Sequence, residues 1–182
     1  IVTLQRLLAG ERVIVVTTAK GVMQATLPRR GLSEVMRTIR RGDVVKMESL
    51  TGSLVDLGYR RVRMVEDSGD FSVRGGIIDL LPFGYEEPVR IELSGDDVDS
   101  IRQFDVYTQR SIRGLDEEVV PPRREVVLHG EGPGELADRL RKEHPADSGD
   151  RDHVVDELDV RFYFDGVEQY IPAIHPDAET VL

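Results

Sequence analysis

The feature that most limits the possible folds is an alternation of apolar and polar residues from Gly58 to Ser111. Such alternation indicates short β-strands, because successive side chains of a strand point to opposite faces of a sheet. Tight-turn residues, mostly Gly, Pro and Asp, separate the strands. Four strands are predicted, with apolar positions at Val62/Met64, Phe71/Val73, Ile77-Ile78 and Val89/Ile91/Leu93. The stretch therefore predicts a β-meander with one apolar and one charged face.

The charged face of this meander is where we look first for function. Arg90 and Glu92 alternate with the apolar positions of the fourth strand, Arg74 ends the second, and Arg61 and Arg63 belong to the first. Guanidinium groups suit carboxylates and phosphates, and arginine is enriched among residues that dominate binding energies. The alternative is a solvated face with cross-strand ion pairs such as Arg90–Glu92, each contributing about 0–1 kcal/mol. From the residues alone, both interpretations stay open.

Three strings in this region carry a resemblance: GDFSVRGGIIDLLP, PVRIELSGDDVDSIRQFD and TQRS. They resemble the inserted domain of the bacterial transcription–repair coupling factors, which is itself similar to the UvrA-binding domain of the excision-repair protein UvrB. The resemblance is specific over residues 58–113, where glycines, strand pattern and charged positions recur together. The compact turn PFGYEEPVR and the ending FDVYTQRS favour the coupling factors over UvrB.

This resemblance implies a fold class and a domain arrangement. The fold is expected to be α/β, with a β-meander-rich insert like the second domain of UvrB flanked by parts of a vestigial RecA-like α/β domain. We expect residues 1–44 to be the departing part of the RecA-like domain, 45–120 the inserted UvrA-binding domain and 121–182 the returning segment. The adjacent prolines Pro121 and Pro122 favour a boundary there, since neither continues a helix.

The resemblance also implies a function. It predicts a non-catalytic interaction module that recruits UvrA to stalled RNA polymerase in nucleotide excision repair, while RNA polymerase and DNA meet other domains of the parent protein. UvrB-like sequences read FRVRG where this one reads FSVRG, so Ser72 removes one basic contact. The UvrA-contacting positions of the family fall on Arg61, Phe71, Arg74, Arg90 and Glu92.

Apolar spacing predicts further elements outside the meander. Helices are expected at residues 4–8, from Thr17 or Thr18 to Leu27, at 47–57 and at 135–143. The apolar run Val13–Val16 predicts a buried parallel strand, and residues 30–43 a strand or loop. A polar loop at 143–152 and a turn at Asp165-Gly166 precede the tail, which departs from the aromatic-rich segment of the family at Tyr170–His175.

The charge distribution favours a protein partner over nucleic acid. Residues 1–74 hold 13 basic and 8 acidic residues, a net charge of +5, whereas residues 75–182 hold 11 and 26, a net charge of −15. An acidic half repels the phosphate backbone. Nucleic-acid binding stays an alternative, through a basic cluster at residues 29–46 that consists of Arg29, Arg30, Arg37, Arg40, Arg41 and Lys46.

The sequence offers little catalytic chemistry. It contains no GxxxxGK[ST] loop, and its four histidines show no metal-ligand spacing, so no ATPase activity, cofactor or metal is predicted. An uncharacterised hydrolase stays an alternative because acidic pairs such as Asp96/Asp97 occur, although a turn explains them. The start lacks Met, so we expect an excised fragment. No apolar run is long enough to span a membrane and there is no Cys, which allows a cytoplasmic location.

Overall fold

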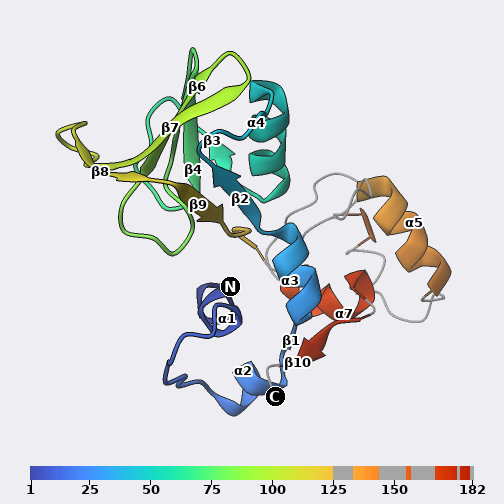
Figure 1. Cartoon of the computed structure of the whole chain (residues 1–182). Helices are drawn as coiled ribbons and strands as arrows, with labels where there is room; N and C mark the ends of the chain where they lie inside the picture. The colour runs from blue at the N-terminus through green and yellow to red at the C-terminus, as the bar shows by residue number, and fades with distance from the viewer. Residues whose placement is uncertain (125–132, 144–154, 157–166, 176, 181–182) are drawn as a thin grey trace. The chain divides into compact units, whose positions relative to one another are not determined.

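A computed structural model describes residues 1–124, 133–143, 155–156, 167–175 and 177–180 of the chain (Figure 1). The chain divides into two compact units. The first unit combines Ile1–Val13 with Ser33–Val127, and the second combines Ile14–Leu32 with Leu128–Leu182. The predicted meander lies in the first unit.

The first unit is built on a six-stranded sheet in which each strand neighbours the next in sequence. The strands are β3 (Arg60–Arg61), β4 (Asp70–Arg74), β5 (Ile77–Leu80), β6 (Val89–Ser94), β7 (Asp97–Phe104) and β8 (Ser111–Leu115). β3 pairs parallel with β4, and the other neighbours are antiparallel. The predicted meander is therefore confirmed, and so is the expected fold class of a mixed α/β protein dominated by sheet.

The first predicted strand, with apolar positions at Val62 and Met64, is wrong. The strand ends at Arg61, and the chain then leaves the sheet. Met64 is 58% exposed, whereas Val65 is buried. The period of two stops where the pairing stops, because only a paired strand holds alternate side chains on opposite faces.

One helix, α4 (Met47–Asp56), covers the apolar face of the sheet (Figure 1). Leu50 and Leu54 lie four residues apart on one side of this helix, as predicted, and both are fully buried. Gly58 follows with a φ of +86°, a left-handed conformation in which the chain leaves the helix cheaply. The two leucines join a single cluster with residues from β4 to β7 that includes Phe71, Ile78, Leu80, Val89, Ile91 and Ile101.

A separate two-stranded sheet joins β2 (Arg37–Arg40) to β9 (Glu117–Val120). The pair is antiparallel, with Arg37 opposite Val120 and Arg40 opposite Glu117. Two segments some 80 residues apart in the sequence, one before the meander and one after it, are thus paired in space.

Helix α3 (Arg29–Val35) precedes β2, so the predicted strand or loop at residues 30–43 is wrong in its first half. The physical reason is the apolar spacing in this segment. Leu32, Val35 and Met36 recur three and four residues apart, and Leu32 is buried, which a helix achieves on one side. The alternation that follows belongs to β2 alone.

Helix α1 (Val2–Leu8) confirms the first predicted helix. Helix α2 (Ala19–Met23) begins as expected after Thr18, whose Oγ1 accepts a hydrogen bond of 3.1 Å from the backbone N–H of Gly21. It ends four residues before Leu27, since the short strand β1 (Ala25–Thr26) follows.

The predicted strand Val13–Val16 is wrong. Residues 11–18 form no helix or strand, and Ile14 and Val16 are 94% and 92% exposed. A parallel strand needs a neighbour to bond with, and no strand among the described residues pairs with this run.

Among the described residues, the second unit contains α2, β1, which is paired antiparallel with β10 (Glu179–Thr180), and three further helical elements. These are α5 (Pro133–Glu143), the 3₁₀ turn η1 (Val167–Tyr170) and α7 (Ile171–Ile174). α5 confirms the helix predicted at 135–143, and its Leu136 is buried, as is Ile171 of α7. Most of the predicted polar loop at 143–152 and the turn at Asp165-Gly166 lie outside the described residues.

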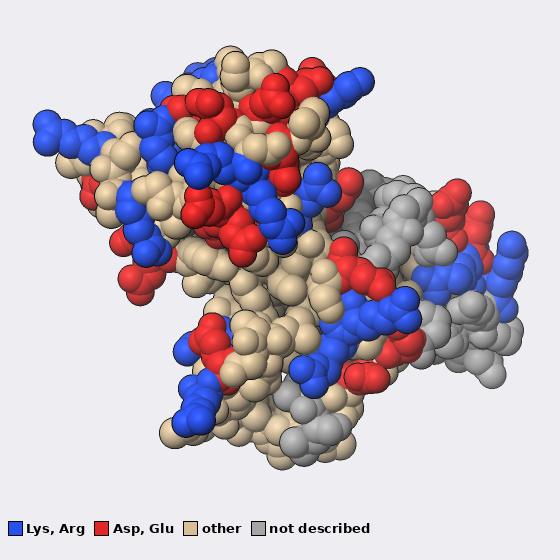
Figure 2. Space-filling view, viewed as in Figure 1, with Lys and Arg blue, Asp and Glu red and all other residues tan. Residues whose placement is uncertain are grey.

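Two properties of the described residues complete the fold. None of their helices is long and apolar enough to cross a membrane. On the face shown in Figure 2, Lys and Arg side chains are interspersed with Asp and Glu side chains.

Candidate functional site

The strand register of the first unit places a row of polar residues on the sheet face opposite α4, here called the outer face. Asp79 on β5 lies opposite Ser72 on β4 and opposite Arg90 on β6. Arg90 in turn lies opposite Arg102 on β7. Paired residues of neighbouring strands share a face, so these side chains gather on one surface.

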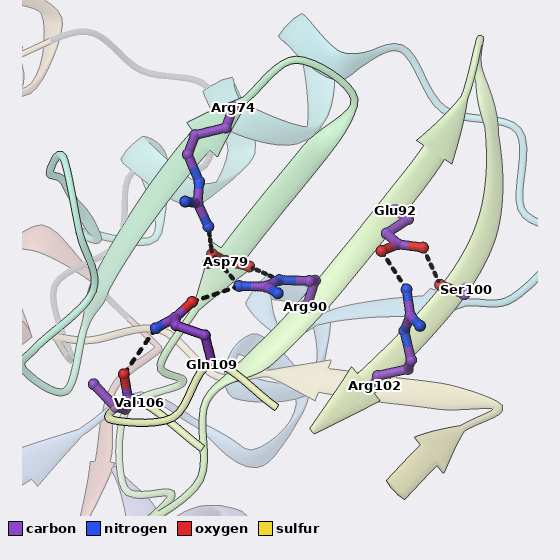
Figure 3. A network of polar contacts seen from close by, with 8 residues as sticks. All are labelled: Arg74, Asp79, Arg90, Glu92, Ser100, Arg102, Val106 and Gln109. Carbon is purple, nitrogen blue, oxygen red and sulfur yellow. Dashed lines mark hydrogen bonds and ion pairs between the residues drawn. The ribbon is translucent and has the colours of Figure 1, made fainter. Parts of the chain in front are cut away.

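Asp79 is the centre of this surface. The residue is only 4% exposed, and its carboxylate accepts three hydrogen bonds from two arginines (Figure 3). Arg90 binds in a fork, with Nε 2.6 Å from Oδ1 and Nη2 2.9 Å from Oδ2. Arg74 adds a bond of 2.7 Å from Nη2 to Oδ2. A buried carboxylate needs such partners, and the fork is the strongest arrangement available to it.

Two further contacts hold Arg90. Its guanidinium lies 4.4 Å from the centroid of the Phe104 ring, a cation–π contact. Its Nη2 also donates to Oε1 of Gln109 at 2.8 Å. The hydrogen bonds to Asp79 raise the pKa of Arg90 above its ordinary value, and its side chain is only 16% exposed. Arg90 is therefore a fixed positive charge rather than a mobile surface side chain.

Glu92 belongs to a second group beside the first. It forms an ion pair with Arg102 and accepts a hydrogen bond of 2.9 Å from the hydroxyl of Ser100 (Figure 3). Arg90 and Glu92, which the solvated-face alternative pairs, both lie on β6, and Asp79 on the neighbouring strand is the carboxylate opposite Arg90.

A small cavity of about 160 Å³ opens beside Asp79. The exposed side chains of Arg63 and Arg74 give it a positive rim, and Met64 contributes apolar surface. The Arg74 side chain is 59% exposed and donates to Asp79, but Asp79 keeps two hydrogen bonds from Arg90 without it. The arrangement is suited to an acidic or amide side chain of a partner protein. Its remaining lining residues are Val65, Ser72, Phe104 and Gln109.

The structure brings together three of the five predicted site residues: Arg74, Arg90 and Glu92. Phe71 is fully buried in the core and offers no surface to a partner, which corrects its expected place among the contacts. Arg61 is exposed, but its register partner is Phe71, so it does not share the outer face with Arg74.

Sequence reasoning missed Asp79, Arg102 and Gln109. Asp79 did give a signal, because it interrupts the apolar run IIDLL, and a buried carboxylate requires a cationic partner. Gln109 gave none, since it is held by a loop whose path depends on the fold. The acidic pair Asp96/Asp97 lies exposed at the β6–β7 turn, as a turn interpretation predicts. No group of three potential metal ligands occurs among the described residues.

The sequence around these residues is similar to a known protein family. Residues 38–125, which include every member of the outer-face network, match the family described as UvrB interaction domain. The chain is 34% identical to the transcription-repair-coupling factor of Mycobacterium bovis over 175 residues, which are 93% of this chain and 14% of that protein.

Two further relatives carry the same name. The protein of Bacillus subtilis is 38% identical over 128 residues, 70% of this chain and 11% of its own length. The protein of Staphylococcus aureus is 33% identical over 139 residues, 76% of this chain and 12% of its own length. The chain thus spans only a small part, 11–14%, of these relatives.

Proposed function

We propose that this chain, whose residues 38–125 belong to the UvrB interaction domain family, is a non-catalytic module of a transcription-repair-coupling factor. Through this module the factor recruits UvrA. The recruitment serves nucleotide excision repair at stalled RNA polymerase. RNA polymerase and DNA are contacted by other parts of the parent protein. The family name and the chemistry of the outer face both support this proposal.

The proposed domain arrangement is an insert, residues 45–120, between two parts of one RecA-like layer, residues 1–44 and 121–182. An inserted domain must have its two ends close together. The pairing of β2 with β9 supports this, since Arg40 and Glu117 lie opposite each other at the borders of the segment.

The observation that carries the proposed function is the network around Asp79. Binding immobilises side chains at a cost of about 0.5–1.5 kcal/mol each, and a preorganised arginine avoids much of this cost. Arg90 is already fixed by Asp79, Phe104 and Gln109. Arg74 supplies an accessible charge beside it. The proposed contacts are Arg74, Arg90 and Glu92, with Arg61 at the exposed edge strand and Phe71 supporting the sheet from within.

The direct test is the affinity of purified UvrA for the chain and for its Arg74→Ala variant, measured by calorimetry. Truncation of a hot-spot arginine typically costs about 2 kcal/mol, so a loss of about thirtyfold is expected. The melting temperature should change little, because the Arg74 side chain is 59% exposed and Asp79 keeps both hydrogen bonds from Arg90. Arg90→Ala should weaken binding too, but it also leaves Asp79 short of partners.

Arg40→Ala is a matched control. The Arg40 side chain is 59% exposed, like that of Arg74, and its guanidinium pairs with Glu117 at 3.0 Å. Its removal should leave UvrA binding unchanged. If the unmodified chain does not bind UvrA, the proposed function is wrong. If Arg74→Ala binds normally while Arg40→Ala does not, the function stands and the site lies elsewhere.

A further inference from the structure

The β7–β8 hairpin ends in a loop, residues 105–110, that lies next to the outer-face network. The loop is bonded within itself. The carboxylate of Asp105 accepts a hydrogen bond of 2.7 Å from the backbone N–H of Thr108. The backbone N–H of Asp105 donates to the carbonyl of Arg110 at 2.9 Å. The hydrogen bond from Thr108 holds the pKa of Asp105 below its ordinary value, so the Asp105 carboxylate stays ionised at neutral pH. The loop is therefore an ordered turn.

Gln109 ties this loop to Arg90. Its φ is +58°, in the left-handed region that residues other than glycine rarely adopt. The side chain spans two elements (Figure 3): its Oε1 accepts from Arg90 at 2.8 Å and its Nε2 donates to the carbonyl of Val106 at 2.8 Å. These two hydrogen bonds offset the backbone strain at Gln109 and fix the loop against Arg90.

Between Val106 and Gln109 the loop presents Tyr107, a residue that is 96% exposed. A tyrosine has few rotatable bonds and a large apolar ring, so a rigid loop presents it at low entropic cost to a partner. Residues 100–115 contain three arginines and one aspartate, and of the arginines Arg102 is paired with Glu92, which leaves Arg110 and Arg113 as positive charges near the loop. Arg110 and Arg113 are both exposed.

We propose that Tyr107 is an aromatic anchor on the same binding surface as Arg74 and Arg90, and that its ring enters an apolar pocket with an acidic rim on the partner protein. The proposal rests on the proposed function, with UvrA as that partner. Charge complementarity favours an acidic rim, because the local surface is positive. A protein is favoured over a nucleic acid because the chain as a whole carries a net charge of −10, which opposes an extended phosphate backbone.

The first experiment compares UvrA binding by the full chain, Tyr107→Ala and Tyr107→Phe. Loss of an aromatic hot spot predicts an affinity at least about tenfold lower for Tyr107→Ala, with an unchanged melting temperature. Tyr107→Phe keeps the ring and should retain most of the affinity. The control is Val44→Ala, since Val44 is 76% exposed and lies outside this loop. This variant should bind like the original chain.

A second readout separates direct contact from a structural effect. The chain has no cysteine, so Thr108→Cys creates a single site for an environment-sensitive dye beside Tyr107. Addition of UvrA should shift the emission of this dye to the blue, and a dye placed by Val44→Cys should not respond.

Each outcome decides something. If neither the unmodified chain nor any variant binds UvrA, the proposed function fails, and the anchor fails with it. If the chain binds UvrA, but Tyr107→Ala binds equally well and the dye stays silent, the anchor alone is wrong. If Tyr107→Ala instead loses affinity only for a fluorescent single-stranded oligonucleotide, the ring is a base-stacking platform and the protein-pocket proposal is overturned.

Discussion

At the scale of single residues, the central question about the outer face was whether its arginines are solvated or organised. The period of two correctly placed Arg90 and Glu92 on one face of β6. It did not predict which acid each arginine meets, because that depends on the register between strands and the paths of the turns. Asp79 is buried and lies opposite Arg90, so its carboxylate accepts hydrogen bonds from both Nε and Nη2 of that arginine. Glu92 pairs with Arg102 instead.

The role of Asp79 leads to a stability prediction for Asp79→Ala. This change leaves Arg90, whose side chain is only 16% exposed, without its carboxylate partner. Breaking a buried pair by removing one member typically costs about 3 kcal/mol or more. The free energy of unfolding, measured by urea denaturation, should fall by about that amount.

Asp67→Ala is the matched comparison for Asp79→Ala. The carboxylate of Asp67 also accepts from an arginine, Arg60, at 3.4 Å, but its side chain is 78% exposed. Its removal should cost less than about 1 kcal/mol. Equal and small losses for both variants would mean that Asp79 is not the organising carboxylate of the outer face.

At the scale of elements, the predictions succeeded where one face of an element packs against its own sheet. α4 shows this, since Leu50 and Leu54 have the sheet directly beneath them. The run Val13–Val16 reads equally well as a buried strand, yet Ile14 and Val16 are exposed. Apolar content predicts burial, but a strand also needs a neighbour for its backbone bonds, and a sequence does not tell which neighbour is present.

The strand β9 contains an acid whose titration is predicted to affect stability. Glu118 is 5% exposed, and burial raises its pKa from 4.5 to about 7, against smaller lowering effects of the Val119 N–H and Arg113. Between these pKa values the folded chain holds a proton that the unfolded chain has released. The stability from this carboxyl is therefore present below about pH 4.5 and is lost as pH rises towards 7.

The variant Glu118→Gln isolates this effect, because glutamine stays neutral at every pH. Its free energy of unfolding relative to the unmodified chain should rise by about 1–3 kcal/mol between pH 5 and pH 8. Urea denaturation of both proteins at the two pH values measures this difference. A difference that does not change with pH would show that Glu118 ionises in the folded chain as readily as in the unfolded one.

At the scale of the whole molecule, charge distribution is the property that separates a protein partner from nucleic acid. The sequence predicted a basic first part and an acidic second part. It did not predict that the fold pairs members of the two. β2 and β9 bring Arg40 to Glu117 at 3.0 Å, and Arg41 to Asp116 at 3.0 Å. Figure 2 shows basic and acidic side chains interspersed on the face in view.

This pairing predicts weak binding to duplex DNA. Counterion release requires arginines that are available to phosphates, and in the basic cluster at residues 29–46 both Arg40 and Arg41 already have carboxylate partners. Fluorescence anisotropy at near-physiological salt should therefore give a dissociation constant weaker than about 10 μM, in the range of non-specific binding. Replacing the two carboxylates, by Asp116→Asn with Glu117→Gln, should free both arginines and strengthen binding with a steeper salt dependence. The opposite pattern would favour nucleic acid: micromolar affinity in the unmodified chain, lost when Arg37, Arg40 and Arg41 are each changed to Glu. In that case the basic cluster, rather than the outer face of the sheet, would be the principal binding surface, since the carboxylate pairs would have failed to compete with phosphate.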